Sequence, residues 1–177
     1  MFLMLLLKNK NLFTLLVLLF SGIATAQIQS VSIGVNGLTC SQCSHSVEMS
    51  IRKLDFVKEV QMNLDKTEAE IFFIDGNKVD ISKIAKSVID AGFSVRYLKA
   101  KIYFNQLSVN ENYCWIYEGG YYQFIKTSTK VLNGLENITF IGKKFMPGKE
   151  YKKWSAALKD AQQKGCESKK IYFISTY

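Results

Sequence analysis

Residues 31–43 read VSIGVNGLTCSQC, and this stretch decides the fold of the first half of the chain. In its first half, valine and isoleucine alternate with small or polar residues, which predicts a half-buried β-strand. A short loop with two cysteines follows, and beyond Cys43 apolar residues recur at helical spacing as far as Leu54. The stretch therefore predicts a strand that enters a helix through a loop containing Cys40 and Cys43.

The residues that follow predict two more strands, a second helix and a last strand. The two strands are expected at 56–64 and 67–74, where β-branched and aromatic residues are frequent. Asp80 is expected to cap a helix whose apolar stripe stops at Gly92, and the last strand is expected at 93–97. The order β-α-β-β-α-β predicts a ferredoxin-like fold of the α+β class, in which two helices cover one face of an antiparallel sheet.

The second half of the chain predicts a separate small α+β domain at residues 99–177. A short linker near 98–101 is expected to join it to the first domain. Pro147 is expected to open a helix that Gly165 ends. The strands expected in this half are 101–109, 113–117, 121–126, 138–144 and 171–174.

Aromatic residues alternate along the predicted strands between residues 113 and 124. Alternation of this kind is typical of strands with one face in a core. We expect most of these side chains to be core residues. A ligand-binding or protein-binding surface that includes Tyr122 and Phe124 is the alternative.

The amino-terminal residues 1–26 have the order of a secretory signal peptide. Two lysines precede a short apolar run, and Ala24-Thr25-Ala26 forms a small-x-small cleavage site before Gln27. The apolar run is shorter than the roughly 20 residues that a membrane-spanning helix needs. Cleavage and export to the periplasm or the exterior are therefore expected, with residues 27–98 as the first mature domain. An uncleaved anchor is the alternative.

Cys40 and Cys43 are the candidate metal ligands. Two thiols at this spacing can meet on one ion, and the partial positive charge at the start of the next helix favours thiolates. Such a pair suits Cu(I), which accepts two or three sulfur ligands, better than Zn(II), which usually takes four in structural sites. His45 lies about 200° around the helix from Cys43 and is expected to point away. A transient or indirect contact of His45 with the ion is the alternative.

Residues 37–43, GLTCSQC, in this place of a βαββαβ chain resemble the heavy-metal-associated domain family over residues 31–98. That family comprises copper chaperones, amino-terminal modules of copper-transporting P-type ATPases and exported mercury-binding proteins. The resemblance implies Cys40 and Cys43 as ligands. Cu(I) is the expected cargo because of the two-sulfur ligand set, with Hg(II) or another thiophilic ion as the alternative, and a metal transporter or other envelope protein is the expected partner.

Two further residues take an expected role from this resemblance. Leu38 stands where the family most often has Met, and it is expected to fill the core beneath the loop. Phe93 follows Ala91 and Gly92 in a segment that resembles the family's segment beside the metal loop, so its ring is expected to shield the site. The resemblance explains nothing of residues 99–177.

Other functions for the cysteines remain open at this point. Cys40 and Cys43 are also spaced as a structural disulfide or a thiol–disulfide exchange site would be. The redox function is less favoured, because thioredoxin-like sites face a cis proline and the only proline is Pro147, in the other half. The protein is therefore expected not to be an enzyme. Cys114 and Cys166 are expected to form a disulfide, with buried free thiols or a second soft-metal contact as alternatives.

Positive charge is concentrated in the second half of the chain. Residues 31–97 carry 8 basic and 9 acidic side chains, a net charge of −1, whereas residues 98–177 carry 13 basic and 6 acidic ones, a net charge of +7. In an exported protein this favours an acidic protein, anionic lipid or another envelope polyanion, and no nucleic acid is expected. Membrane contact is expected only through the signal segment or this basic surface. Lysines spread over a solvated surface are the favoured interpretation, and a partner-docking module with secondary metal binding is the alternative.

Overall fold

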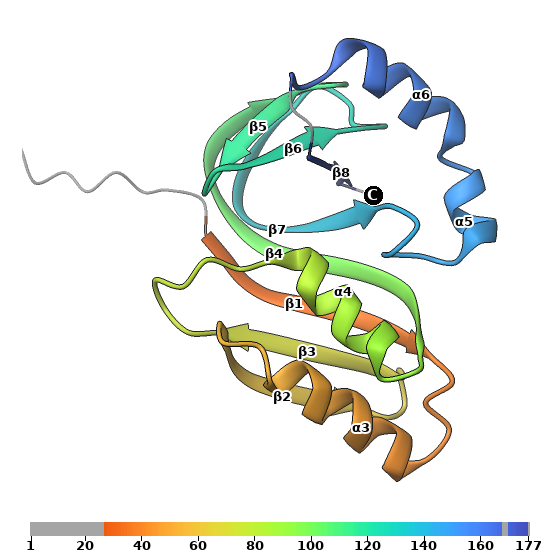
Figure 1. Ribbon diagram of the computed structural model, residues 1–177. Helices are drawn as coiled ribbons and strands as arrows, with labels where there is room; N and C mark the ends of the chain where they lie inside the picture. Colours follow the sequence, from red (N-terminus) through yellow and green to blue (C-terminus); the bar gives the residue numbers. More distant parts are fainter. Residues whose placement is uncertain (1–26, 168–169, 177) are drawn as a thin grey trace, which may run out of the picture.

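The computed structural model of the protein describes residues 27–167 and 170–176, so the predicted signal peptide lies outside the described residues. The described strands form one eight-stranded sheet in the order β2-β3-β1-β4-β7-β8-β6-β5 (Figure 1). The strands are β1 (Gln27–Asn36), β2 (Val57–Asn63), β3 (Glu68–Phe73), β4 (Ser94–Val109), β5 (Cys114–Tyr117), β6 (Gly120–Phe124), β7 (Lys130–Ile141) and β8 (Ile171–Ser175). The helices are α3 (Ser41–Arg52), α4 (Ile81–Asp90), α5 (Gly148–Lys152) and α6 (Ser155–Lys164).

The amino-terminal half has the predicted ferredoxin-like order of elements. β1 pairs antiparallel with β3 and β4, and β2 pairs antiparallel with β3. α3 and α4 lie together over one face of these strands (Figure 1), and they contribute fully buried residues such as Val47 and Ile84 to the same core as Ile33 of β1. Asp80 caps α4 as predicted, because its carboxylate accepts hydrogen bonds from two amides of the first turn at 2.9 and 3.2 Å.

β4 connects the two halves of the chain directly. The linker predicted near 98–101 is wrong, because β4 continues unbroken through these residues. Every second residue from Leu98 to Phe104 is fully buried, so one strand periodicity crosses the predicted boundary. β4 pairs with β1 on one edge and with β7 on the other, and one hydrophobic cluster includes residues of both halves. The division into domains at 27–98 and 99–177 stays a prediction.

The carboxy-terminal half extends the sheet and adds helices of its own. β5 and β6 form an antiparallel hairpin, and β8 inserts between β6, to which it is parallel, and β7, to which it is antiparallel. α5 and α6 lie apart from α3 and α4 (Figure 1), and Leu158 of α6 packs in a second small cluster with Ile125 and Ile141. Within the described ranges, no helix is long and apolar enough to cross a membrane.

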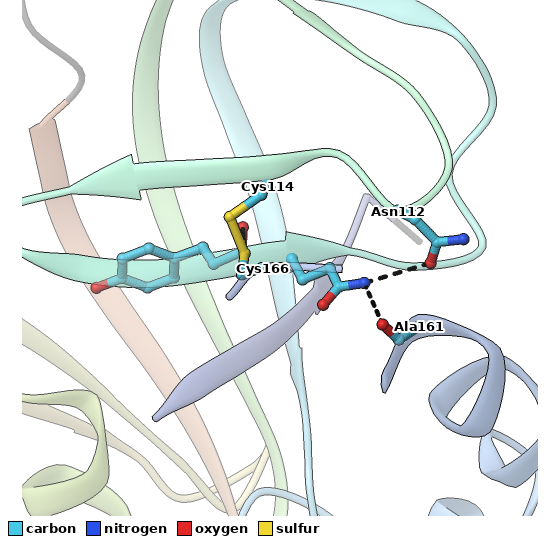
Figure 2. Close-up of a disulfide and its surroundings, with 6 residues drawn as sticks. Asn112, Cys114, Ala161 and Cys166 are labelled. Atoms are coloured by element: carbon cyan, nitrogen blue, oxygen red, sulfur yellow. Dashed lines mark hydrogen bonds between the residues drawn. A yellow bond between two sulfur atoms is a disulfide. The ribbon is translucent and has the colours of Figure 1, made fainter. Parts of the chain in front are cut away.

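A disulfide joins Cys114 at the start of β5 to Cys166 just after α6, with the two Cα atoms 5.4 Å apart (Figure 2). It closes a long loop, because the two residues are 52 positions apart in the sequence. The aromatic residues of the same hairpin are mainly core residues, as predicted. Trp115, Tyr122 and Phe124 are at most 7% exposed.

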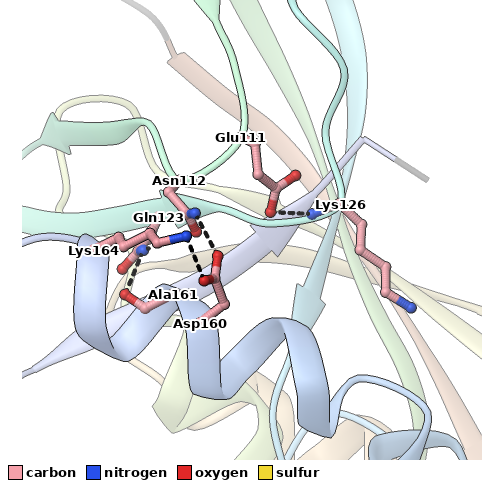
Figure 3. Close-up of polar contacts among 7 residues, drawn as sticks. All are labelled: Glu111, Asn112, Gln123, Lys126, Asp160, Ala161 and Lys164. Carbon is pink, nitrogen blue, oxygen red and sulfur yellow. Dashed lines mark hydrogen bonds and ion pairs between the residues drawn. The ribbon is translucent and has the colours of Figure 1, made fainter.

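A polar network fixes α6 beside this disulfide (Figure 3). The fully buried Gln123 donates from Nε2 to the Ala161 carbonyl at 2.8 Å and to Asn112 Oδ1 at 3.4 Å. Asn112 in turn donates to Asp160, 3.0 Å away. The helix predicted between Pro147 and Gly165 is divided into α5 and α6, and α6 ends at Gly165 as predicted. Only glycine fits at this position, because a Cβ there would lie 1.9 Å from Gln123 Oε1.

Candidate metal centre

The loop between β1 and α3 is shaped by one glycine and anchored by one leucine. Gly37 has φ +89°, a left-handed conformation that favours glycine, and its carbonyl accepts a hydrogen bond from the Thr39 amide at 2.9 Å. Leu38 is only 7% exposed and belongs to the main hydrophobic cluster. The loop therefore turns sharply at its start and is held to the core just before the first cysteine.

The two cysteines occupy the start of α3. Cys40 is the N-cap residue, with extended backbone, and its Sγ accepts a hydrogen bond from the Cys43 amide at 3.2 Å. Cys43 lies in the first turn, as predicted from the sequence. The Ser44 amide and hydroxyl both donate to the Cys40 carbonyl, at 3.1 and 3.3 Å. The positive end of the helix therefore faces the sulfur atoms, and α3 carries no acidic residue in its first turn.

Cys40 and Cys43 are joined by a disulfide in the structure, with their Cα atoms 5.3 Å apart. Cys40 is exposed, and Cys43 is half-buried against the main cluster. Two electrons and two protons convert this disulfide to two thiols, and loss of the protons gives two thiolates. The arrangement can thus act chemically as a redox pair or as a two-sulfur ligand set.

Among the described residues, the site offers two strongly coordinating side chains, those of Cys40 and Cys43. In the described part of the chain, no group of three or more His, Cys, Asp or Glu side chains could hold a metal ion. His45 is exposed on α3 and joins Cys40 and Cys43 in no such group. A two-ligand sulfur set favours ions that accept low coordination numbers.

Phe93 lies beside the loop. A Cβ placed on Gly37 would be 3.7 Å from Phe93 Cδ1, and the ring also packs against the main cluster. Gly92 allows this approach, because its φ of +89° lets the chain leave α4 and turn back toward β1. An aromatic ring therefore stands next to the cysteine loop and contributes no ligand atom.

Sequence reasoning missed two features of this site. It did not assign the N-cap role to Cys40, because cysteine is outside the residue types that normally signal a cap. It also missed Ser44, whose buried hydroxyl donates a hydrogen bond to the Cys40 carbonyl. A serine one position after the second cysteine, just inside a predicted helix, was the available signal.

The fold and the site together define a class of protein, a ferredoxin-like module that presents two cysteines from the loop between its first strand and first helix. A sequence model of the heavy-metal-associated domain matches residues 32–94. The mercuric transport protein periplasmic component of Pseudomonas fluorescens is 37% identical over 68 residues, which are 38% of this chain and 74% of that protein. The chain therefore belongs to the heavy-metal-associated domain family.

Other relatives match the same region. Copper-transporting ATPase 1 of Rhizobium meliloti is 36% identical over 67 residues, which are 38% of this chain and 8% of that protein. The crystal structure of oxidized MerP from Ralstonia metallidurans CH34 is 33% identical and covers 40% of this chain and 97% of that one, with a TM-score of 0.35.

Proposed function

We propose that this protein is exported and binds a soft metal ion through Cys40 and Cys43. Cu(I) is the favoured ion, and Hg(II) is the alternative. The observation that carries the proposal is the placement of the two cysteines at the positive end of α3, 5.3 Å apart at Cα. In the reduced protein, the two sulfurs form a compact anionic pair. The family match supports a metal cargo, because it covers both cysteines.

The ligand set argues for Cu(I) or Hg(II) over Zn(II). Structural Zn(II) sites usually need four ligands, whereas soft ions are held by few thiolates. The described residues supply no third strong ligand near Cys40 and Cys43. Relatives are named for both soft ions, mercuric transport in one case and copper transport in the other.

Transfer of the ion follows from the unequal exposure of the two cysteines. Cys40 is exposed and Cys43 is half-buried, so a partner's thiol reaches the ion from the Cys40 side. The partner's sulfur adds to give a three-coordinate intermediate, and Cys40 then leaves before Cys43. Leu38 and Phe93 hold the loop during this exchange because both pack against the main cluster. A metal transporter or another envelope protein is the proposed partner.

Export imposes a redox step before loading. Residues 1–26 supply the proposed signal peptide, and the Pseudomonas fluorescens relative is named as a periplasmic component. Disulfides persist in such compartments. The Cys40–Cys43 disulfide must therefore be reduced to two thiols by a dithiol partner, which becomes oxidised in the same exchange, before the site can bind its ion.

Anaerobic titration tests the proposal. The reduced protein from Gln27 onward is titrated with Cu(I), Hg(II) and Zn(II), in competition with a chelator of known affinity for each ion. One equivalent of Cu(I) or Hg(II) is expected to bind tightly, and Zn(II) weakly. The Cys40→Ser, Cys43→Ser variant is expected to lose this binding, while His45→Ala, a change on the exposed face of the same helix, keeps it. Tight binding that survives loss of both cysteines would refute the assignment.

A second candidate function is thiol–disulfide exchange. The specific observation in its favour is that Cys40 and Cys43 form a disulfide at the start of a helix, and that Cys40 is exposed. The measurement is reduction of an exposed substrate disulfide by the reduced protein. Rapid exchange with no tight metal binding would move the protein to this class. Tight metal binding with slow exchange would exclude it.

A further inference from the structure

The lysines of the carboxy-terminal half are concentrated in one segment. Residues 143–167 comprise the loop after β7, α5, α6 and the turn that follows, and they carry seven lysines and three carboxylates, a net charge of +4. Figure 1 shows this loop, α5 and α6 in succession along one side of the carboxy-terminal half, apart from α3 and α4. Residues 31–97, which include both candidate metal ligands, have a net charge of −1. Positive charge is therefore gathered away from the amino-terminal half.

The apolar residues of this segment point inward and hold it on the sheet. Phe145 and Met146, in the loop before α5, are each 7% exposed. Leu158 and Ala161 of α6 are buried, and both pack with Met146 and with Ile141 of β7 in the second small cluster. The segment is thus anchored from its inner side, and its polar side is left facing solvent.

Five of the seven lysines have no carboxylate partner. Lys153 pairs with Glu150 at 2.9 Å, and Lys164 pairs with Asp160 at 2.7 Å. The other five are exposed and form no ion pair within the described ranges, and we call them the lysine face: Lys143, Lys144, Lys149, Lys152 and Lys159. Lys149 and Lys152 are three positions apart on α5, so they share one side of that helix.

Carboxylates near the segment do not neutralise the lysine face. Glu167, exposed just beyond α6, is included in the net charge of +4. Glu111 accepts hydrogen bonds from the Lys126 and Thr127 amides, at 3.0 and 2.9 Å. The Lys126 ammonium lies 4.8 Å from the centroid of the Trp154 ring, so Glu111 and Lys126 together add one charge of each sign. The positive balance is unchanged when both are counted.

The composition of the lysine face favours a lipid surface over a protein partner. Protein interfaces are anchored by aromatic, methionine and arginine side chains, and lysine is depleted in them. Among the described residues, no large hydrophobic side chain of residues 143–167 is exposed, and both arginines, Arg52 and Arg96, belong to the other half. Ammonium groups on flexible stems, without fixed partners, suit the diffuse negative potential of an anionic bilayer.

We propose that the lysine face docks the exported protein on an anionic lipid bilayer. The attraction is electrostatic and leaves the apolar residues of the segment in the protein core. Docking gives a function to a region that the heavy-metal-associated domain match, at residues 32–94, does not cover. It also keeps the protein beside membrane-embedded partners, and this last consequence alone rests on the proposed transfer of a metal ion to a transporter.

Vesicles of phosphatidylcholine, with and without phosphatidylglycerol, test the proposal. The chain from Gln27 onward, with both disulfides intact, is titrated with each kind of vesicle, and the bound fraction is measured by sedimentation. Binding is expected only to the vesicles that contain phosphatidylglycerol, and it is expected to weaken as salt is raised. The Lys144→Gln, Lys149→Gln, Lys152→Gln variant is expected to lose roughly 30-fold to 100-fold in affinity, because each lysine near an anionic surface contributes about fivefold.

A matched variant separates the lysine face from the overall charge of the protein. Lys53→Gln, Lys58→Gln, Lys83→Gln removes the same charge from exposed, unpaired positions of the amino-terminal half, and it is expected to keep vesicle affinity within about twofold. The proposal is overturned by an absence of binding to the anionic vesicles, by equal binding to both kinds of vesicle, or by equal loss in the two variants.

Poly-glutamate is the third probe, and it stands for an acidic protein. Weaker binding to poly-glutamate than to the anionic vesicles, at the same concentration of negative charge, is expected. Tighter binding to poly-glutamate would overturn the proposal in favour of an acidic protein partner. None of these measurements involves a metal ion, so their failure would leave the proposed metal site at Cys40 and Cys43 unaffected.

Discussion

Replacement of Leu38 by alanine is expected to destabilise the protein from beneath the metal loop. Leu38 is 7% exposed, and the substitution removes three buried carbons, which at about 0.8 kcal/mol each contribute roughly 2.4 kcal/mol. A remaining cavity adds to this value in rigid cores. Because Leu38 lies on a loop that can partly collapse, we expect the free energy of unfolding to fall by about 2–3 kcal/mol.

Urea unfolding of the oxidised protein measures this change, with an unchanged m-value as the sign that only stability has altered. Two variants provide matched controls. Leu64→Ala removes the same carbons from a side chain that is 55% exposed, and it is expected to change stability by less than about 0.5 kcal/mol. Leu38→Met, the residue most often found in the family, is expected to cost less than about 1.5 kcal/mol. If Leu38→Ala and Leu64→Ala lose equal amounts, Leu38 does not anchor the loop in the core.

Three other predictions concern the carboxy-terminal half. Gly165→Ala is expected to cost about 1–3 kcal/mol in urea unfolding, since its Cβ would overlap the Gln123 amide, and the loss should be smaller when Gln123 is also alanine. Replacement of both Cys114 and Cys166 by serine is expected to cost roughly 4 kcal/mol, because their bridge constrains a long loop of the unfolded chain. Burial and the neighbouring Glu118 raise the pKa of Tyr117 to about 12, so its contribution to stability is complete below pH 10 and is lost as pH rises toward 12. Tyr117→Phe should therefore show a shallower loss of stability over that range.

Each of these three has an outcome that contradicts it. Additive effects of the Gly165 and Gln123 substitutions would show that the two side chains do not compete for space. Unchanged stability of the double serine variant would show that the bridge does not form or constrains nothing. Equal alkaline destabilisation of the wild type and Tyr117→Phe would show that Tyr117 ionises at its ordinary pKa.

The sequence by itself determined the amino-terminal fold and the candidate ligands. Strand alternation, helical stripes and the Asp80 cap are local patterns, and each is set by residues within a few positions of one another. The cysteine pair could be placed at the start of α3 for the same reason, since its spacing and the helix that follows are both local. The structure confirms this placement, because Cys40 is the N-cap residue of α3 and Cys43 lies in its first turn.

The tertiary structure alone decided how the second half joins the first. The alternation from Leu98 to Phe104 is a local signal that β4 continues through residues 98–101. Its pairing with β7 links residues far apart in the chain, so the sequence near 98–101 did not reveal it. The stacking of Tyr122 on Tyr172 was equally hidden, because the two rings meet only when β8 inserts beside β6. Even the role of Gly165 depended on a distant partner, the buried amide of Gln123, rather than on its own backbone angle. Contacts of this kind are fixed by packing between distant segments, which local periodicity cannot encode.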